Sequence, residues 1–487
     1  MLDLSHDPRT GDAVDGPPHS GADEVASLVR AAASAFAQVS MATPARRRGW
    51  LEAVADAVEA HADELVAVAD EETALGTPRL LNELGRTVSN MRYYAAVGES
   101  GGWMHACIET VAGPPPLDLR RADLPVGPVA VFGASNFPFM FGVLGHDSCS
   151  AVAAGCPVVV KAHPAHPRLS LRLAEVARSA FASAGAPDGV FALVVGFDAG
   201  SALVDAPDIA AVAFTGSQAG GMALVERARL RPVPIPVYAE MGTVNPVVVT
   251  PAAGGRIDEI ARDFVASFTL GAGQFCTKPG LMLAPAGCGA VEAIAAHTTR
   301  APGVWLLSDG ITRAYRDGVA ALRAAGGRVA AEGETLDDGY AARPTLLQVT
   351  PAELIAGSRL LEECFGPVAL LAEYTGTDDA LAVLRRMQPS LAGSVYGAGD
   401  DDSDTPALVT QLAGQVGRVV IDGPPTGVAC IDAMHHGGPW PSTSVPSATS
   451  VGARALNRFT RPVAFQNVPQ AALPPALRDD NPWHLPR

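Results

Sequence analysis

Apolar residues recur along this chain with two different periods. Between residues 22 and 97 they return every three or four positions in alanine-rich segments such as ADEVASLVRAAASAFAQV, and this spacing predicts amphipathic helices. From residue 124 onward, short continuous apolar runs alternate with helical segments, as in PVAVFG, PVVVKA, VFALVVG and IAAVAFTG. Such alternation predicts βαβ units and a parallel sheet, so we expect an α/β fold.

A second set of strands and helices begins near residue 240, where the strand-like NPVVVT precedes the helical RIDEIARDFVASFTLG. The 487 residues are enough for more than one domain, and a hydrophobic content of 48% allows a large core. Residues 1–22 are instead polar and rich in Gly, Pro and Asp. This composition predicts a leader that hugs the surface or is partly mobile.

Charge and cysteine spacing exclude several classes of protein. The net charge of −16, from 51 acidic and 35 basic residues, argues against nonspecific binding to nucleic acid or to an anionic membrane surface. The chain opens without a signal-peptide pattern and contains no apolar stretch of about 18 residues, so we expect a cytoplasmic protein. The seven cysteines show neither CxxC nor Cys/His spacing, which predicts no disulfide and no metal site.

Cys276 is the candidate nucleophile. A single cysteine is usually a small buried hydrophobe, but Cys276 stands among glycines in GAGQFCTKPG. The glycines let the backbone pass close to a ligand and leave the sulfur accessible. A thiolate that adds to an aldehyde forms a thiohemiacetal, whose hydride can leave toward a nicotinamide ring. The segment therefore indicates covalent oxidation of an aldehyde.

Two further residues fit the same chemistry. The thioester product needs a base that activates water, and Glu240 follows the apolar run PIPVY, where a strand would present it at its carboxyl edge. Negative charge on oxygen needs a fixed neutral donor, and Asn136 in VFGASNFPFMFG can supply one together with the backbone N–H of Cys276. Taken alone, Glu240 reads as an ordinary strand-end carboxylate and Asn136 as a turn residue.

Six segments follow one another in a fixed order, namely VFGASNFPF, CPVVVKAHPAHP, AVAFTGSQAGG, YAEMGTVNPVVV, GAGQFCTKPG and EECFGPVALL. Together they resemble the aldehyde dehydrogenase superfamily along nearly the whole chain. The resemblance implies an α/β fold with a Rossmann-type cofactor domain, an α/β catalytic domain and a small β oligomerisation arm. The implied extents are residues 1–106 and 126–239 for the NAD(P)-binding domain, 240–455 for the catalytic domain, and 107–125 and 456–487 for the bridging arm.

The resemblance also implies roles for individual residues. Cys276 would be the nucleophile, Glu240 the general base and Asn136 the oxyanion donor. At EMGTVNP the wider superfamily usually has Gly-Gly-Lys after the base, whereas this chain has small residues. The branch of the superfamily that the C-terminal part of this chain resembles, described below, has small residues there as well. The departure therefore leaves the implied catalysis intact.

For the cofactor, the resemblance implies that Lys161 binds the adenosine ribose and that Glu363 binds the nicotinamide ribose. Phe365 would pack beside the nicotinamide, and the turn of residues 216–221 would face the pyrophosphate. Without that context the turn is a weak signal, because it is not a GxGxxG fingerprint. The remaining cofactor-binding candidates are His163, Pro164, Gly216, Ser217, Gly221 and Gly242.

The tail narrows the resemblance. PTGVACIDAMHHGGPWPSTS is similar to the branch that contains 2,5-dioxopentanoate (α-ketoglutaric semialdehyde) dehydrogenases and the NADP-dependent fatty aldehyde dehydrogenase of luminous bacteria. His436 matches the histidine of the HGGP element, which that branch places near the active site. His436 is therefore a candidate second acid/base or substrate contact. The alternative is a solvated loop histidine beside His435.

Cofactor choice depends on the loop after Lys161. The position three residues further on, often a glutamate that clasps the adenosine ribose, is Pro164, so no carboxylate there opposes NADP. The segment KAHPAHPR also brings His163, His166 and Arg168 near Lys161, which can receive a 2′-phosphate. The same segment can equally be a loop that leads into a helix. We expect NADP or NAD as the cofactor, with NADP favoured.

The favoured activity is NAD(P)-dependent, non-acylating oxidation of 2,5-dioxopentanoate to 2-oxoglutarate. The substrate carboxylate would need a cationic partner, and Arg86 and Arg92 are candidates unless they only face solvent. One alternative is oxidation of medium- or long-chain aliphatic aldehydes along the apolar FPFMFGVLG. A coenzyme A-acylating enzyme would not need Glu240, and a catalytically silent binding protein of the same fold is an alternative of another class. The expected partners are a small-molecule aldehyde and further copies of the chain, as a homodimer or homotetramer.

Overall fold

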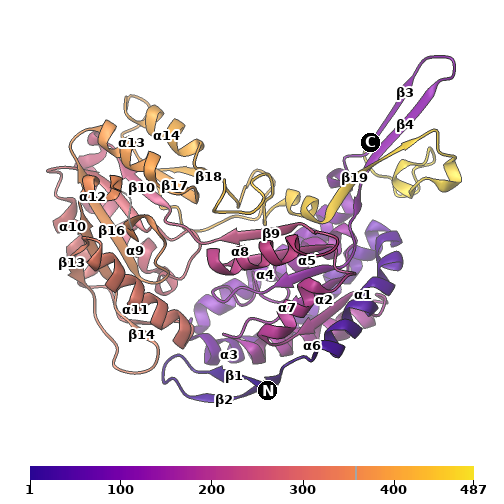
Figure 1. Ribbon diagram of the computed structural model, residues 1–487, viewed down its shortest axis with the longest axis horizontal. Helices are drawn as coiled ribbons and strands as arrows, with labels where there is room; N and C mark the ends of the chain where they lie inside the picture. The colour runs from indigo at the N-terminus through magenta and orange to yellow at the C-terminus, as the bar shows by residue number, and fades with distance from the viewer. Residues whose placement is uncertain (357–358) are drawn as a thin grey trace.

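Two sheets, each covered by helices on both faces, make up most of the computed structural model, which describes residues 1–356 and 359–487 (Figure 1). The first sheet has five parallel strands in the order β7-β6-β5-β8-β9. The predicted α/β class is therefore confirmed. The strands are β5 (Val129–Phe132), β6 (Val158–Lys161), β7 (Phe191–Val194), β8 (Ala211–Gly216) and β9 (Val237–Met241).

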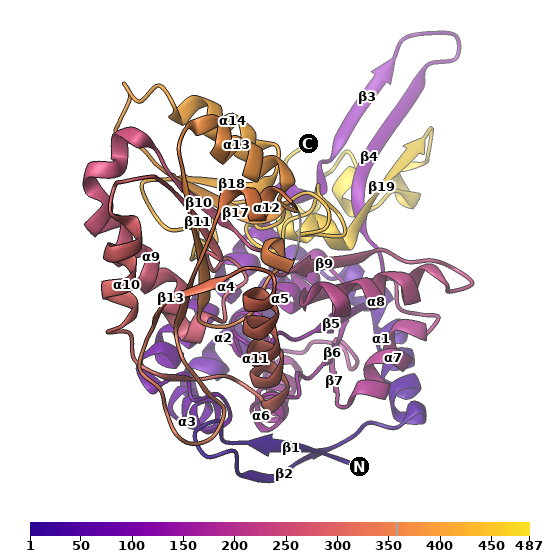
Figure 2. The same cartoon turned by 60° about the vertical axis from the view of Figure 1, so that its left-hand side comes forward.

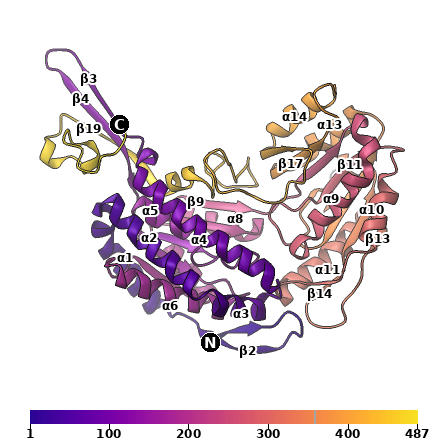
Figure 3. The same cartoon turned by 180° about the vertical axis from the view of Figure 1, so that it is seen from behind.

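Both faces of the first sheet are buried, which explains its continuous apolar runs. On β5, Val129 and Val131 pack into one core cluster while Ala130 and Phe132 pack into another. The first cluster also holds α2 (Pro44–Ala60), α3 (Ala62–Thr73), α4 (Thr77–Ser100), α5 (His146–Ala154) and α6 (Pro167–Ser183), seen from behind in Figure 3. The second cluster holds α1 (Ala22–Met41), α7 (Phe197–Asp205) and α8 (Gln218–Arg229).

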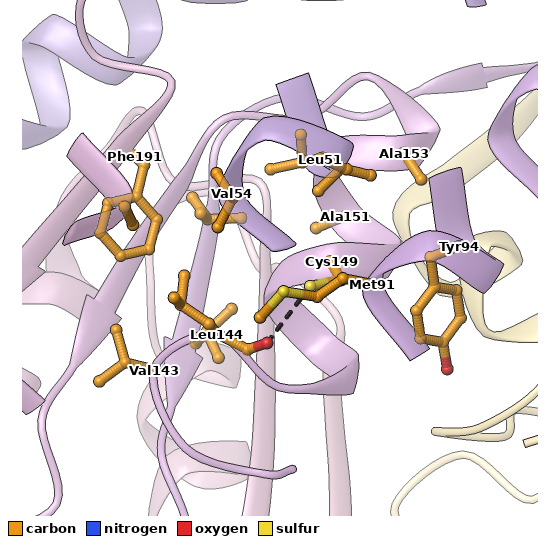
Figure 4. Close-up of a cluster of buried hydrophobic side chains, with 14 of the residues drawn as sticks. Leu51, Val54, Met91, Tyr94, Val143, Leu144, Cys149, Ala151, Ala153 and Phe191 are labelled. Atoms are coloured by element: carbon orange, nitrogen blue, oxygen red, sulfur yellow. Dashed lines mark hydrogen bonds between the residues drawn. The ribbon is translucent and has the colours of Figure 1, made fainter. Parts of the chain in front are cut away.

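Part of the first cluster is shown in Figure 4. Met91 of α4 and Leu51 of α2 lie against the start of α5, where the Cys149 thiol donates to the carbonyl oxygen of Leu144 at 3.3 Å. Cys149 is thus a buried structural cysteine, as most free cysteines are. All seven cysteines of the chain are free thiols.

The second sheet has seven strands in the order β13-β15-β16-β11-β10-β17-β18, and all neighbours are parallel except β13 and β15. Its strands are β10 (Pro246–Val249), β11 (Leu281–Pro285), β13 (Arg328–Glu332), β15 (Thr345–Val349), β16 (Val368–Tyr374), β17 (Ser390–Tyr396) and β18 (Val416–Ile421). One face is covered by α9 (Ile257–Thr269) and α10 (Ala290–Thr298). The other is covered by α11 (Asp309–Ala324), α12 (Pro351–Ile355), α13 (Thr377–Arg386) and α14 (Thr405–Ala413).

A separate antiparallel sheet joins distant parts of the chain. Strands β3 (Cys107–Val111) and β4 (Leu117–Pro125) form a hairpin, and β19 (Thr460–Gln466) pairs with β4. The hairpin projects away from the two large sheets in Figures 1 and 2. Arg120 on β4 donates to Asp479 and to the carbonyl of Leu477, so the end of the chain is fastened to this sheet.

The N-terminal segment is a hairpin of β1 (Leu2–His6) and β2 (Ala13–Pro18), and it lies beneath α3 and α6 in Figure 1. No strand was predicted here, because Gly16, Pro17 and Pro18 interrupt the alternation of apolar and polar residues. A short pair, β12 (Val304–Trp305) with β14 (Ala341–Ala342), completes the strands of the described residues. No helix in the described part of the chain is long and apolar enough to cross a membrane.

Candidate active site

The predicted catalytic residues come from the ends of several elements and meet between the two large sheets. Glu240 is the fourth residue of β9, and the chain then crosses into β10 of the second sheet. Asn136 follows β5, and Cys276 follows the 3₁₀ turn that ends α9. Carboxyl ends of parallel strands and the loops beyond them are where α/β sheets place their ligands.

The loop that carries Cys276 needs its glycines. Gly271, Ala272 and Gly273 all have positive φ values of 55°, 61° and 67°. A Cβ on Gly273 would lie 2.3 Å from the carbonyl oxygen of Gly366, so a side chain has no room there. The backbone thus approaches the EECFGP segment closely. The predicted approach of this backbone to a ligand stays a prediction.

Two residues that sequence reasoning missed hold this loop. Asn245 donates from Nδ2 to the carbonyl oxygens of Cys276 at 2.8 Å and Lys278 at 3.1 Å. The buried Lys278 ammonium donates to the carbonyls of Cys364 at 2.9 Å and Val368 at 2.8 Å. Both are buried, and a buried Lys needs partners of this kind. The position of Asn245 beside the apolar run PVVV was the available signal, whereas Lys278 stands in the partly polar segment QFCTKPG.

His436 lies between Cys276 and Glu240. Its Nε2 atom lies 3.5 Å from Cys276 Sγ and 3.5 Å from Glu240 Oε2. The His436 side chain is only 3% exposed, so the solvated-loop interpretation of this residue does not describe its environment. Its neighbour His435 is half-buried.

The segment that carries His436 reaches Glu240 because the residues after it pair with β9. Glu240 forms an antiparallel bridge with Thr443, and the N–H of Met241 donates to the carbonyl of Ser442 at 2.9 Å. The N–H of Ser450 donates to Glu240 Oε1 at 3.1 Å. The other oxygen of Glu240, Oε2, is buried and makes no hydrogen bond within the described residues. It is therefore available to a proton, a water molecule or a substrate atom.

Burial dominates the electrostatics of this group. Desolvation raises the pKa of Glu240 to about 8, against opposing contributions from Ser450 and Arg458. Desolvation likewise lowers the pKa of His436 to about 3, helped by Arg418 and His435. Burial, with the nearby Glu240 and Glu363, raises the pKa of the Cys276 thiol to about 12. In the free enzyme the site therefore favours a neutral imidazole and a thiol that needs a base.

Asn136 is buried beside the Cys276 loop. Its Nδ2 atom donates to the carbonyl of Gln274 at 2.7 Å, two residues before the nucleophile. The backbone carbonyl of Asn136 accepts from Arg79 at 2.8 Å, and the Arg79 guanidinium lies against the rings of both Phe137 and Phe275, which contact each other. An amide carries two N–H bonds, so one can fix its orientation while the other faces an oxyanion.

A nicotinamide dinucleotide fits the residues beside Glu240. The carboxylate of Glu363 lies against Gly242, where a Cβ would meet Oε2 at 2.2 Å. Oε1 of Glu363 is buried without a hydrogen-bond partner in the described part of the chain, and burial raises the pKa of this carboxyl to about 7. An orphaned carboxyl oxygen of this kind suits a ribose hydroxyl. Phe365, two residues later, is partly exposed.

The turn between β8 and α8 adjoins the same place. Gly242 N–H donates to the carbonyl of Gly216 at 3.1 Å. Ser217 is the N-cap of α8, and its hydroxyl accepts from Gly220 N–H at 3.1 Å. A Cβ on Gly221 would lie 2.7 Å from Met241 Sδ, so this helix packs closely on β9. The N-terminus of a twelve-residue helix beside Gly216 can hold a pyrophosphate.

The loop after β6 is less basic than its sequence suggests. The pKa of His163 falls well below its usual range through burial, and its Nδ1 accepts from Ala165 N–H at 3.1 Å. His166 contacts the carbonyl of Ala134 at 2.9 Å, and burial lowers its pKa to about 4. Arg168 pairs with Glu71 at 3.0 Å. Lys161 remains as the charged group nearest the end of β6, while Pro164 is exposed.

The two candidate arginines for a substrate carboxylate differ. Arg92 forms ion pairs with Asp56 at 2.8 Å and Glu59 at 2.6 Å on α2, so its charge is already paired. Arg86 donates to the carbonyl of Val428 in the tail at 2.9 Å and forms no ion pair with any described residue. Arg86 is exposed on α4, and of the two arginines it is the one that contacts the tail segment leading to His436.

The chain is similar to known proteins over most of its length. Two relatives named α-ketoglutaric semialdehyde dehydrogenase cover most of the chain. That of Azospirillum brasilense is 43% identical, covering 99% of this chain and 94% of its own length, and that of Acinetobacter baylyi is 40% identical, covering 96% and 90%. The crystal structure of an NAD-dependent aldehyde dehydrogenase from Sinorhizobium meliloti is 24% identical with a TM-score of 0.83, covering 96% of this chain and 92% of that one.

A second solved structure supports the same fold. It is that of a Pseudomonas syringae aldehyde dehydrogenase in complex with NAD and octanal, with a TM-score of 0.81, 21% identity, and coverage of 96% of this chain and 93% of that one. The aldehyde dehydrogenase-like fold inferred from the motifs is thus confirmed. The model of the family described as "Aldehyde dehydrogenase family" matches residues 4–462. With that match, which includes both large sheets and the tail around His436, the chain belongs to the aldehyde dehydrogenase family and is an NAD(P)-dependent aldehyde dehydrogenase.

Proposed function

We propose that Cys276, Glu240, Asn136 and His436 carry out the oxidation. The observation that carries this proposal is the single imidazole nitrogen that lies 3.5 Å from both the thiol and the acid. A neutral His436 with its proton on Nδ1 accepts the thiol proton of Cys276 through Nε2 as the sulfur bonds to the aldehyde carbon. The two events coincide because a ring with a pKa of about 3 in the free enzyme does not hold that proton beside a free thiolate. In the same step the carbonyl oxygen becomes an oxyanion.

Asn136 and the backbone N–H of Cys276 stabilise that oxyanion by hydrogen bonds. A bound nicotinamide supplies the acceptor for the hydride that leaves the carbon. Glu363, whose carboxylate lies beside Gly242, would hold the nicotinamide ribose. The carbon is then held to Cys276 as a thioester, which keeps the acyl group in place for the next step.

Hydrolysis of the thioester returns the enzyme to its starting state. Glu240, through the free Oε2, takes a proton from water, and the hydroxide adds to the acyl carbon. The carbon–sulfur bond then breaks and the acid is released. The Cys276 thiolate recovers its proton from His436, and Glu240 gives the proton that it took from water to the solvent. Because the pKa of Glu240 is raised to about 8, its basic form increases as the pH approaches that value.

For the substrate we propose 2,5-dioxopentanoate, which is oxidised to 2-oxoglutarate. The support is the two relatives named for α-ketoglutaric semialdehyde, at 43% and 40% identity over nearly the whole chain. Arg86 is the proposed partner of the substrate carboxylate, because its guanidinium has no acidic partner among the described residues. Aliphatic aldehydes are the less favoured alternative, because both relatives are named for the semialdehyde and Phe139 of the segment FPFMFGVLG packs in the main hydrophobic core.

For the cofactor we propose that both dinucleotides are accepted and that NADP is favoured, because Pro164 offers no carboxylate to the ribose. The proposed division of the chain into domains is the one that the resemblance implies. In this proposal the arm of β3, β4 and β19 pairs with a second copy of the chain in a homodimer or homotetramer. Seven free thiols fit a reducing cytoplasm. Light scattering of the purified chain gives the oligomeric state directly.

The test of the central proposal is Cys276→Ala. This variant should lose aldehyde oxidation and keep dinucleotide binding, since the sulfur supplies covalent chemistry and few cofactor contacts. Steady-state rates with 2,5-dioxopentanoate, succinate semialdehyde and a medium-chain aldehyde then rank the substrates. NAD(P)H formation by Cys276→Ala above background would remove the proposed nucleophile, and a higher kcat/KM for the medium-chain aldehyde would favour the alternative substrate.

A further inference from the structure

The N-terminal hairpin lies at the adenosine end of the proposed cofactor site. In the first sheet Lys161 of β6 pairs with Val194 of β7. The next residue, Val195, accepts from Ser20 N–H at 2.9 Å, and a Cβ on Gly196 would lie 2.9 Å from the ring of His19. The end of the hairpin is therefore within two residues of the strand partner of Lys161.

The hairpin is also fastened to the loop that follows Lys161. Ser5 on β1 donates to Glu72 Oε1 at 2.7 Å. The same carboxylate accepts from the N–H groups of Arg168 and Leu169 at 2.9 Å each, at the start of α6. A Cβ on Gly16 would lie 3.4 Å from Pro167. One buried acid thus joins the first strand of the chain to the KAHPAHPR segment.

Two further contacts fix the turn of the hairpin. Arg9 pairs with Asp70 of α3 at 2.8 Å. The carbonyl of Pro8 accepts from Tyr340 N–H at 2.8 Å, next to β14, which lies near the N-terminal hairpin in Figures 1 and 3. Held at both ends, the hairpin keeps its side chains in place when a dinucleotide binds.

Asp3 is the acidic residue that this hairpin brings to the site. Its Oδ1 atom lies 2.7 Å from His19 Nε2, and its Oδ2 atom is buried without a hydrogen-bond partner among the described residues. Burial lowers the pKa of Lys161, and the charge of Asp3 raises it again. The field of the Asp3 carboxylate therefore reaches the ammonium that is proposed to bind the adenosine ribose.

We propose that Asp3 limits the preference for NADP by placing a carboxylate near the 2′ position of the adenosine ribose. Pro164 leaves its own position neutral, and Asp3 brings a negative charge from a distant part of the chain. A 2′-phosphate adds about −1.5 to −2 charges near Asp3, whereas the 2′-hydroxyl of NAD adds none. The inference rests on the proposed placement of the cofactor at Lys161, and it assigns the N-terminal hairpin to the cofactor site.

The test is direct binding of two fragments that lack the nicotinamide. Calorimetry measures the Kd of ADP-ribose and of 2′-phospho-ADP-ribose with the wild-type protein and with Asp3→Asn. The variant should bind 2′-phospho-ADP-ribose more tightly by about three- to thirtyfold, the scale of one nearby charge in partly solvated surroundings, and ADP-ribose nearly unchanged. Asp3→Glu, which keeps the charge, should stay close to wild type.

Asp15→Asn is the matched control, because Asp15 is an exposed acid on the other strand of the same hairpin. It should change neither Kd, since it removes the same net charge at a different place. An equal ratio of the two Kd values in wild type and Asp3→Asn overturns the inference, as does an equal shift in Asp15→Asn. Asp3→Ser is the second neutral variant if Asp3→Asn loses its thermal transition.

The same measurements separate this inference from the proposed function. If the wild-type protein binds neither fragment, the cofactor placement is wrong and the role of Asp3 falls with it. If both bind and the ratio does not respond to Asp3, only the role of Asp3 is wrong. Aldehyde turnover is not used in either measurement, so a mistaken substrate does not affect the result.

Discussion

His436 Nε2 lies 3.5 Å from Glu240 Oε2, and the same nitrogen lies 3.5 Å from the sulfur of Cys276. Glu240, the proposed base for thioester hydrolysis, is therefore in contact with His436, the proposed base for the thiol. Burial keeps that ring neutral, with a pKa of about 3, while it raises the pKa of Glu240 to about 8. A proton shared by this pair in the free enzyme therefore stays on Glu240, and neither side chain becomes an isolated buried charge.

Replacing His436 by Gln should slow the reaction of Cys276 with iodoacetamide at pH 7 by about tenfold or more, because the thiol loses its proton acceptor. The rate is measured by mass spectrometry of the Cys276 peptide, which excludes the other cysteines. Turnover should fall by about 10²-fold with dinucleotide binding unchanged. An unaltered alkylation rate would mean that His436 contacts substrate and does not activate the sulfur.

Glu240→Gln should slow turnover more than the first hydride transfer, because it removes the base for hydrolysis and keeps the shape of the side chain. Rapid mixing should then show a burst of NAD(P)H followed by a slow steady state. Equal loss in burst and steady state would give Glu240 a part before hydride transfer, through its contact with His436.

The raised pKa of Glu240 also predicts how stability depends on pH. The carboxyl titrates near 4.5 when unfolded and near 8 when folded, so between these values the folded state holds a proton that the unfolded state has lost. Stability contributed by this group is therefore lost as the pH rises from about 4.5 to about 8. Glu240→Gln removes the titration. From pH 5 to pH 8.5 the free energy of unfolding of this variant should therefore rise relative to that of the wild type by about 2 to 4 kcal/mol.

Urea denaturation at pH 5, 7 and 8.5 measures that gain. Glu24→Gln on the exposed face of α1 is the control, and its difference from wild type should stay constant with pH. A constant difference for Glu240→Gln as well would show that burial does not raise the pKa of this carboxyl.

Asn136→Ala should lower kcat by about 10²-fold, as expected for the loss of one oxyanion donor. Part of the loss can come from the loop, because Asn136 also donates to the carbonyl of Gln274. Asn136→Asp keeps the size of the side chain but loses the donor to Gln274 as well, so it should lower kcat at least as much as Asn136→Ala. Normal kcat in both variants, with a change confined to KM, would make Asn136 a binding residue.

Much of the fold was readable because parallel strands buried on both faces have continuous apolar runs. Strands β5, β6, β7 and β8 each match such a run, and the motifs after them gave the candidate residues their order. The N-terminal hairpin was not predicted, since its strands are held by contacts to Glu72 and Tyr340 and have no apolar alternation of their own. Strand propensity is weak where tertiary contacts decide the structure.

The sequence predicted which residues belong to the candidate site better than it predicted how they are arranged. His436 reaches Glu240 because Ser442 and Thr443 pair with β9, about 200 residues away in the sequence, and no local pattern encodes that pairing. The basic character of KAHPAHPR was overestimated for a similar reason. His166 hydrogen-bonds to the carbonyl of Ala134, and Arg168 forms an ion pair with Glu71. Only the packed structure reveals these contacts.

Pro164→Glu should shift cofactor choice toward NAD. Pro164 is exposed in the loop that follows Lys161, so a glutamate there has room to extend toward the adenosine ribose. Its carboxylate would accept hydrogen bonds from the ribose hydroxyls of NAD and would repel the 2′-phosphate of NADP, at a cost to NADP of about 1 to 3 kcal/mol. The ratio of kcat/KM for NADP to that for NAD should therefore fall about ten- to a hundredfold. Pro164→Gln is the control, because it makes the same change in the backbone without the charge, and its ratio should stay near wild type. An unchanged ratio in Pro164→Glu would mean that this loop does not meet the ribose, and the cofactor would have to be placed elsewhere.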